Sequence, residues 1–161
     1  MVSNDFFHEI ELLVYDCDGV LTDNRVIVDQ HGNESAIFNR GDGLAITAIA
    51  KDLNIPQLII STEKNPIILH RAKKLNIEVY NGVSDKKQAL INYCLEHSIE
   101  LKHVMYIGND VNDLRVMEVV GIKGCPKDAE SEILSISNWV SSKNGGFGVI
   151  RDLYRQLLTV R

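Results

Sequence analysis

The sequence has few cysteines and no long apolar run. It contains three cysteines in 161 residues, Cys17, Cys94 and Cys125, and none belongs to a CxxC pair. This odd, widely spaced set argues against a disulfide framework and a cysteine zinc site, and it predicts reduced, mostly buried thiols. No apolar stretch approaches the roughly 18 residues of a membrane span, and no basic segment precedes an apolar one at the start. We therefore expect a cytoplasmic protein that does not enter a membrane.

Positive charge is also scarce. Lys and Arg number 17 against 22 Asp and Glu, which gives a net charge of −5. This balance disfavours a nucleic-acid binder, so an anionic substrate needs local cations or a metal ion. The five histidines show no metal-ligand spacing. Hydrophobic residues make up 45% of the chain, as in a globular protein with a core, and the length predicts one domain over 1–161.

Short apolar runs alternate with helical patterns along the chain. Asp42 and Ser84 are expected to cap two helices, and Leu95 is expected on the buried face of the second. The alternation predicts a three-layer α/β fold with a parallel central sheet. A Gly-containing turn predicts one inserted β-hairpin, about 24–38, with strands at 25–29 and 34–38. The other strands are predicted at 10–15, 58–60, 104–107 and near 122, and the helices at about 42–53, 66–75, 84–95, up to 119, and in a C-terminal tail at 144–161.

Polar residues follow three of the predicted strands. Asp16 and Asp18 follow the first strand, Ser61 the second, and Asn109 and Asp110 the third. The carboxyl ends of parallel strands meet at one edge of the sheet, where α/β proteins bind ligands. Two close carboxylates repel unless a cation lies between them, and carboxylate and amide oxygens suit Mg²⁺. Taken alone, the two aspartates are equally typical of a solvated acidic turn.

Lys86 is predicted on the apolar face of its helix, in the first turn. A cation there opposes the positive end of the helix dipole, which favours a side chain that points past the helix end towards an anion. A lysine whose ammonium group reaches water is the alternative. Ser61 either caps the following segment or donates to a phosphoryl oxygen. Asp113 is either a helix cap or, with Asn109 and Asp110, a metal ligand.

Taken in order, these residues resemble the four motifs of the haloacid-dehalogenase superfamily: DCDGVLTD at 16–23, Ser61, Lys86 and GNDVND at 108–113. Smaller matches, including SDK at 84–86 and GGFGVIR at 145–151, resemble its small capless branch. That branch contains 3-deoxy-manno-octulosonate 8-phosphate phosphatase and phosphatases of nine-carbon keto-acid 9-phosphates. The resemblance implies a Rossmann-like domain without a cap, bound Mg²⁺ and a homotetramer.

The resemblance also implies a role for each motif residue. Asp16 is the implied nucleophile that forms an aspartyl phosphate, and Asp18 the implied general acid and base. Ser61 and Lys86 are implied to hold the phosphoryl oxygens. In octulosonate phosphatases an Asp usually stands at the position of Asn109, so one metal ligand is implied to be neutral here. The full set of implied metal ligands is Asp16, Asp18 through its main-chain carbonyl, Asn109 and Asp110.

The choice of substrate depends on the residues after Ser61. Octulosonate phosphatases usually carry Gly-Arg there, whereas this chain has Thr62 and Glu63, and the nine-carbon branch is similar in having Glu and a Lys at the position of Lys74. We therefore expect a nine-carbon keto-acid 9-phosphate, with the eight-carbon substrate next. That Glu63 and Lys74 are surface residues without a substrate contact is the alternative. The implied substrate-binding residues are Arg40, Thr62, Glu63, Lys74 and Arg151.

Two other functions compete with catalysis. A receiver domain also combines acidic residues, a hydroxyl and a lysine, but its phosphorylated Asp follows the third strand, whereas the acidic pair here follows the first. Domains similar to this one also occur fused to acylneuraminate cytidylyltransferases, where they serve assembly. A weakly active or non-catalytic module associated with such a transferase is therefore the main alternative.

Overall fold

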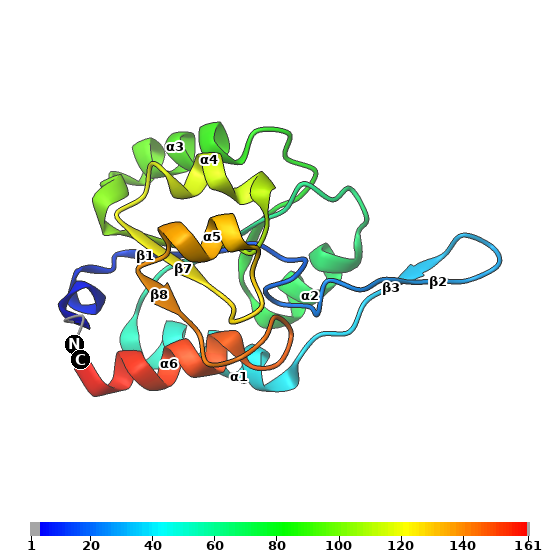
Figure 1. Ribbon diagram of the computed structural model, residues 1–161, viewed down its shortest axis with the longest axis horizontal. Helices are drawn as coiled ribbons and strands as arrows, with labels where there is room; N and C mark the ends of the chain where they lie inside the picture. The colour runs from blue at the N-terminus through cyan, green and yellow to red at the C-terminus, as the bar shows by residue number, and fades with distance from the viewer. Residues whose placement is uncertain (1–3, 161) are drawn as a thin grey trace.

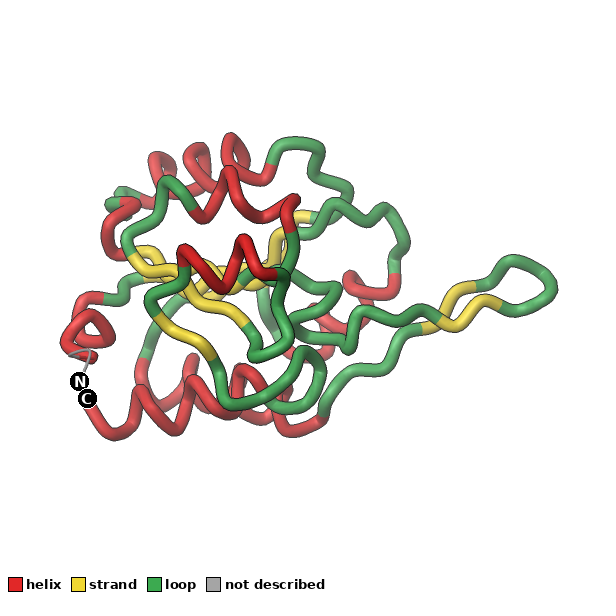
Figure 2. The backbone as a smooth tube through the Cα atoms, in the orientation of Figure 1, coloured by secondary structure: helices red, strands yellow, loops and turns green. Residues whose placement is uncertain are grey.

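The computed structural model describes residues 4–160 as a parallel sheet between two helical layers, with a hairpin that projects from one end (Figures 1 and 2). The six strands of the sheet lie in the order β5-β4-β1-β6-β7-β8, and β2 pairs with β3 in the hairpin. The strands are β1 (Leu12–Tyr15), β2 (Ile27–Val28), β3 (Glu34–Ser35), β4 (Gln57–Ile60), β5 (Glu78–Tyr80), β6 (Val104–Ile107), β7 (Ile122–Cys125) and β8 (Trp139–Val140). The α-helices are α1 (Arg40–Ala48), α2 (Ile67–Leu75), α3 (Lys86–His97), α4 (Leu114–Met117), α5 (Ser131–Ile136) and α6 (Val149–Val160).

Strand β1 lies at the centre of the sheet, and all four of its residues are buried. Leu13 and Tyr15 pack into the core formed with α1, α2 and α6, whereas Leu12 and Val14 pack into the core formed with α3, α4 and α5. A strand covered on both faces is uniformly apolar, which explains the unbroken run in the sequence. The predicted three-layer α/β fold is confirmed, and no cap domain is inserted among the described residues.

Two helices begin differently from the prediction. Asn39, not Asp42, caps α1, because Asn39 is extended and its side chain accepts hydrogen bonds from two N–H groups of the first turn, at 2.7 and 3.2 Å. Asp42 instead accepts a 2.9 Å bond from the N–H of Arg151, so it caps α6 from a distant part of the chain. Asp85, not Ser84, caps α3 by accepting the N–H three residues on, at 3.0 Å.

Several element lengths also differ. Helix α1 ends at Ala48 and continues as a π-helical turn, Ile49–Leu53, and α4 ends at Met117, short of the predicted 119. The hairpin strands have two residues each, fewer than predicted. Leu95 is 74% exposed, because Leu90 and Cys94 lie on the buried face of α3 and Leu95 does not. Within residues 4–160 no helix combines the length and the apolar composition that crossing a membrane requires.

Candidate active site

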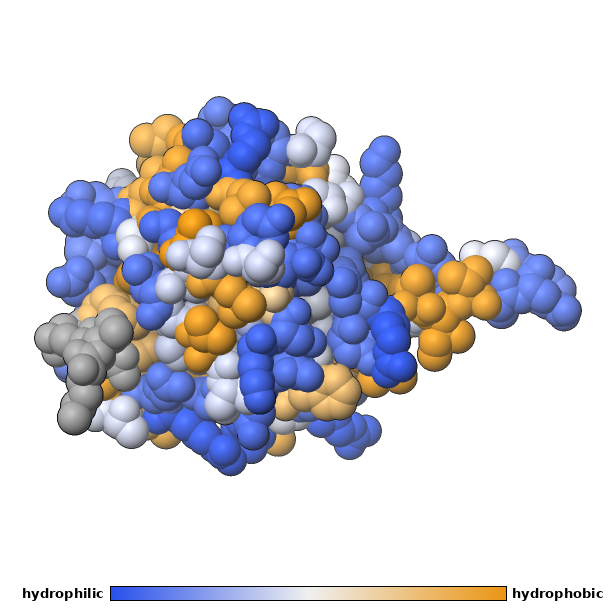
Figure 3. Space-filling view, in the orientation of Figure 1, coloured by the Kyte–Doolittle hydropathy of each residue, from blue (hydrophilic) through white to orange (hydrophobic). Residues whose placement is uncertain are grey.

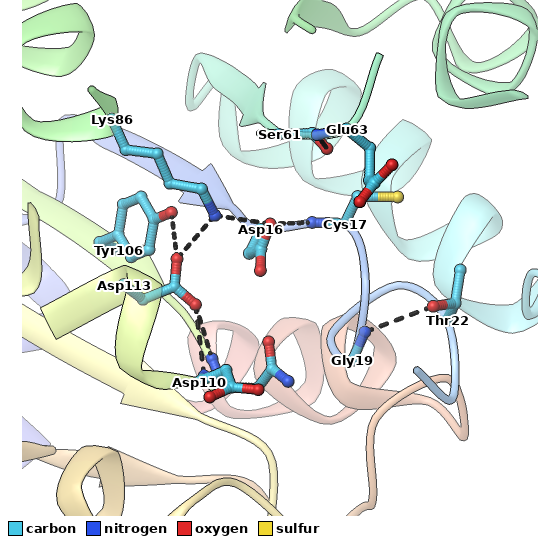
Figure 4. A network of polar contacts seen from close by, with 11 residues as sticks. Asp16, Cys17, Gly19, Thr22, Ser61, Glu63, Lys86, Tyr106, Asp110 and Asp113 are labelled. Atoms are coloured by element: carbon cyan, nitrogen blue, oxygen red, sulfur yellow. Dashed lines mark hydrogen bonds and ion pairs between the residues drawn. The ribbon is translucent and has the colours of Figure 1, made fainter. Parts of the chain in front are cut away.

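Strands β1 and β4 and helix α3 bring the four predicted catalytic residues to one edge of the sheet. Asp16 follows β1, Ser61 follows β4, and Lys86 is the first residue of α3. Lys86 Nζ lies 2.8 Å from Asp16 Oδ1 and 2.8 Å from Oδ1 of Asp113, and all three side chains are almost fully buried. Figure 4 shows the lysine reaching between the two carboxylates. Lys86 therefore meets anions inside the protein and does not extend into water.

Asp113 is the residue of this cluster that sequence reasoning did not assign to catalysis. Its Oδ1 accepts bonds from Lys86 and from the Tyr106 hydroxyl, both at 2.8 Å, and its Oδ2 accepts the N–H groups of Asn109 at 3.0 Å and Asp110 at 3.4 Å (Figure 4). One carboxylate thus positions both the lysine and the loop after β6. The capping role that the sequence left open is present as well: Asp110 is the N-cap of the turn at 111–113, and Asp113 completes a capping box with it.

Burial dominates the electrostatics of the cluster. Burial, followed by repulsion from Asp113, raises the pKa of the Asp16 carboxyl, while the Lys86 cation opposes the rise. Burial alone lowers the pKa of Lys86, but attraction to the two carboxylates outweighs it and the net shift is upward. Burial and the charge of Glu63 raise the pKa of Asp18. Lys86 is consequently held in its charged form, while acidic groups crowd around the site.

Oxygen atoms converge beside Asp16. When the Asn109 amide is turned so that its nitrogen faces the acidic loop, that nitrogen donates to Asp16 Oδ2 at 3.3 Å and to the main-chain oxygen of Asp18 at 2.8 Å. In the opposite orientation the amide oxygen faces the same two oxygens, an arrangement that a cation between them satisfies. One carboxylate, one amide and one main-chain carbonyl form a hard-oxygen donor set that fits Mg²⁺. Among residues 4–160, no group of three or more His, Cys, Asp or Glu side chains is placed to hold a metal ion, so the donor set here depends on the amide and the main-chain oxygen.

Glycines make this convergence possible. Gly19 has φ +89°, and a Cβ there would lie 2.0 Å from the Asn109 side-chain nitrogen, so only glycine leaves room for that amide. The C-terminal segment supports the same loop: Gly146 donates its N–H to the Val20 carbonyl at 3.0 Å, and a Cβ on Gly145 would lie 1.9 Å from the Gly19 oxygen. The glycine-rich segment at 145–148 therefore packs directly against the loop that follows β1.

A cavity of about 210 Å³ opens beside the cluster, between the loops after β1 and β4 and the hairpin. Asp18, Ser61 and Glu63 line it from the sheet edge, and Glu34 from the hairpin. The Asn65 side chain donates to Glu34 Oε2 at 2.7 Å, which joins the hairpin to the loop that precedes α2. The hairpin thus forms one wall of the cavity.

The other predicted substrate-binding residues lie elsewhere. Arg40 and Thr62 are exposed and do not line the cavity. Lys74 is exposed in the last turn of α2, whereas the first turn of that helix lines the cavity. Arg151 joins α6 to α1, since its N–H donates to Asp42 and its Nε donates to the Gly41 carbonyl at 3.2 Å. Substrate contacts by these four residues stay a prediction. Arg25, Glu34 and Asn65 line the cavity but were not predicted, because no local pattern marks which residues of the hairpin and of the loop before α2 face the cavity.

Comparisons with known proteins agree with this geometry. The model of the haloacid dehalogenase-like hydrolase family matches residues 29–153. The 3-deoxy-D-manno-octulosonate 8-phosphate phosphatase KdsC of Salmonella typhi is 33% identical over 150 residues, which cover 92% of this chain and 79% of the relative. The chain belongs to the haloacid dehalogenase-like hydrolase family.

Solved structures support the same assignment. A HAD family hydrolase from Streptomyces avermitilis is 38% identical with a TM-score of 0.90, over 95% of this chain and 87% of the other. A 3-deoxy-D-manno-octulosonate 8-phosphate phosphatase from Moraxella catarrhalis, in complex with magnesium ion, phosphate ion and a KDO molecule, is 29% identical with a TM-score of 0.91, over 99% and 93% of the two chains. The predicted family, fold and phosphomonoester hydrolase class are confirmed.

Proposed function

We propose that this protein is a Mg²⁺-dependent phosphatase that hydrolyses the phosphate ester of a 2-keto-3-deoxy sugar acid through an aspartyl phosphate on Asp16. The observation that carries the proposal is the buried contact of Lys86 with Asp16 and Asp113, next to a cavity that Asp18 and Ser61 line. A buried carboxylate beside a fixed cation, at an open cavity, is suited to attack on an anionic phosphoryl group.

Each residue has a distinct task in this reaction. Asp16 attacks phosphorus while Asp18 protonates the departing sugar oxygen, and Asp18 then takes a proton from the water that hydrolyses the aspartyl phosphate. Lys86 and the Ser61 hydroxyl hold the phosphoryl oxygens. Asp16, the Asp18 carbonyl and Asn109, with Asp110 nearby, would hold Mg²⁺, which when bound offsets the negative charge of the phosphoryl group.

Two substrate lengths fit the proposal. Glu63 and Glu34 line the cavity, and carboxylates accept hydrogen bonds from sugar hydroxyls. The Glu at position 63, in place of an arginine, favours a nine-carbon nonulosonate 9-phosphate. The eight-carbon octulosonate 8-phosphate is the second candidate, because the Salmonella typhi relative and the Moraxella catarrhalis structure are both octulosonate 8-phosphate phosphatases.

The proposal extends to assembly and location. Val26, Ile27, Val28 and Ile37 of the hairpin are each more than half exposed, and Figure 3 shows this apolar surface on the projecting segment. Apolar side chains grouped in this way favour burial against a neighbouring subunit, as in the predicted homotetramer, where a neighbour would cover the cavity. The three buried, free cysteines are in keeping with a cytoplasmic domain spanning 1–161.

A substrate panel tests the function. Phosphate release from eight- and nine-carbon keto-acid phosphates is measured with and without Mg²⁺, for the wild type and for Asp18→Asn. We expect Mg²⁺-dependent release that falls at least about 100-fold in the variant, the lower range for removing a general acid–base. Equal release by both proteins would refute the mechanism and leave a cytidylyltransferase-associated module as the alternative. Faster release from the eight-carbon ester would refute only the nine-carbon preference.

A further inference from the structure

The cavity wall is rich in acidic groups and poor in cations. Asp18, Glu34 and Glu63 all line it. Arg25 is the cationic side chain among the described residues that line this wall. A dianionic phosphate ester that also carries a carboxylate meets repulsion from three acids here, so its second anionic group needs a cation outside the phosphate site.

Arg25 is held in an orientation suited to that purpose. Its Nε and Nη2 donate to Asp23 Oδ2 at 2.9 and 2.6 Å, and its main-chain N–H donates to Asp23 Oδ1 at 3.2 Å. These bonds use one edge of the planar guanidinium, and the described residues offer no acceptor to the Nη1 edge. The side chain is 80% exposed, so that edge is open to a ligand.

The backbone turns immediately before Arg25. Asn24 has φ +65°, a left-handed conformation that asparagine adopts more readily than most residues, and its N–H donates to the Thr22 hydroxyl at 3.3 Å. The chain therefore turns sharply between the acidic loop and the hairpin. Asn24 and Arg25, at and after this turn, both line the cavity.

We infer that Arg25 is a specificity-determining residue that binds the carboxylate of the sugar-acid substrate through its open guanidinium edge. This inference rests on the proposed function and adds to it the basis of selection for an acidic sugar phosphate over a neutral one. The phosphate lies at Asp16 and Lys86, beside the cavity, and the carboxylate lies at the hairpin. Asp23 positions the arginine and does not contact substrate.

The test compares an acidic with a neutral phosphate ester. The acidic ester is the eight-carbon octulosonate 8-phosphate, or the nine-carbon ester if the wild type hydrolyses that faster, and the neutral one is mannose 6-phosphate, which has no carboxylate. The ratio of the two kcat/KM values, acidic over neutral, is measured for each variant. For Arg25→Ala we expect this ratio to fall about tenfold or more, mainly through a higher KM for the acid, the size of one lost charge-assisted contact. Arg25→Lys should recover part of the ratio.

Arg155→Ala is the charge-matched control, because Arg155 is exposed on α6 and does not line the cavity; its ratio should equal that of the wild type. An unchanged ratio in Arg25→Ala, with wild-type activity towards the acid intact, would overturn the inference. An equal loss on both esters would also overturn it, because Arg25 would then act on the phosphate or on the fold. Failure of the wild type to hydrolyse any ester would instead count against the proposed function.

Discussion

Replacement of Lys86 by methionine tests the energetics of the buried cluster. The variant keeps an unbranched side chain one atom shorter but leaves Asp16 and Asp113 facing each other without the cation that contacts each at 2.8 Å. Breaking a buried ion pair by removing one partner costs about 3–5 kcal/mol, because a charge stays buried without compensation. For a domain with an unfolding free energy of about 5–15 kcal/mol, this is a large fraction of the total.

Urea unfolding followed by far-UV circular dichroism measures this cost. With a denaturant slope of about 2 kcal/mol/M, the expected loss shifts the midpoint downward by about 2 M. Lys87→Met is the control, since Lys87 is next in the chain and forms no ion pair among the described residues; it should change stability by less than about 0.5 kcal/mol.

A second substitution separates charge from packing. Adding Asp113→Asn to Lys86→Met removes one of the two uncompensated carboxylates, so the double variant should be more stable than Lys86→Met alone. If Lys86→Met is as stable as Lys87→Met, the buried cluster does not depend on its cation and the reasoning is refuted. If the double variant is less stable than the single one, packing and hydrogen bonding, not charge, account for the loss.

Three further substitutions test the surroundings of the cluster. Asn109→Asp adds a charge to the oxygen donor set, so the Mg²⁺ concentration for half-maximal phosphate release should fall several-fold; an unchanged or higher value contradicts the proposed ligand. Gly145→Ala places a Cβ 1.9 Å from the Gly19 oxygen and should destabilise the fold by about 1–3 kcal/mol, measured by thermal unfolding, and an unchanged Tm would show that this contact is not tight. Burial raises the pKa of Asp42 in the folded state, so its contribution to stability is fully present below its unfolded pKa and is lost as pH rises through its folded pKa. Urea midpoints across that range should therefore decline more steeply for the wild type than for Asp42→Asn, and parallel declines would contradict the assigned cause.

Local sequence patterns determined the fold class and the chemistry of the strand ends. The run of apolar residues in β1 and the aspartates that follow it are adjacent in the chain, and burial on both faces requires that run in any parallel sheet. The position of Lys86 in the first turn of its helix indicated an anion beyond the helix end but left a solvated lysine as the alternative, because the helix dipole disfavours a cation there without fixing its partner. The motif order was sufficient to place the chain in its family.

Contacts between distant segments were decided only by the tertiary structure. Lys86 and Asp113 are 27 positions apart, and Asp42 and Arg151 are 109 apart, so no helical or strand period relates them. Asp113 therefore has the pattern of a helix cap in the sequence, although in the fold it also pairs with the buried lysine. The cavity wall depends in the same way on where the hairpin lies relative to the sheet. The polar residues of a projecting segment follow no periodic pattern, so the sequence does not show which of them face the cavity.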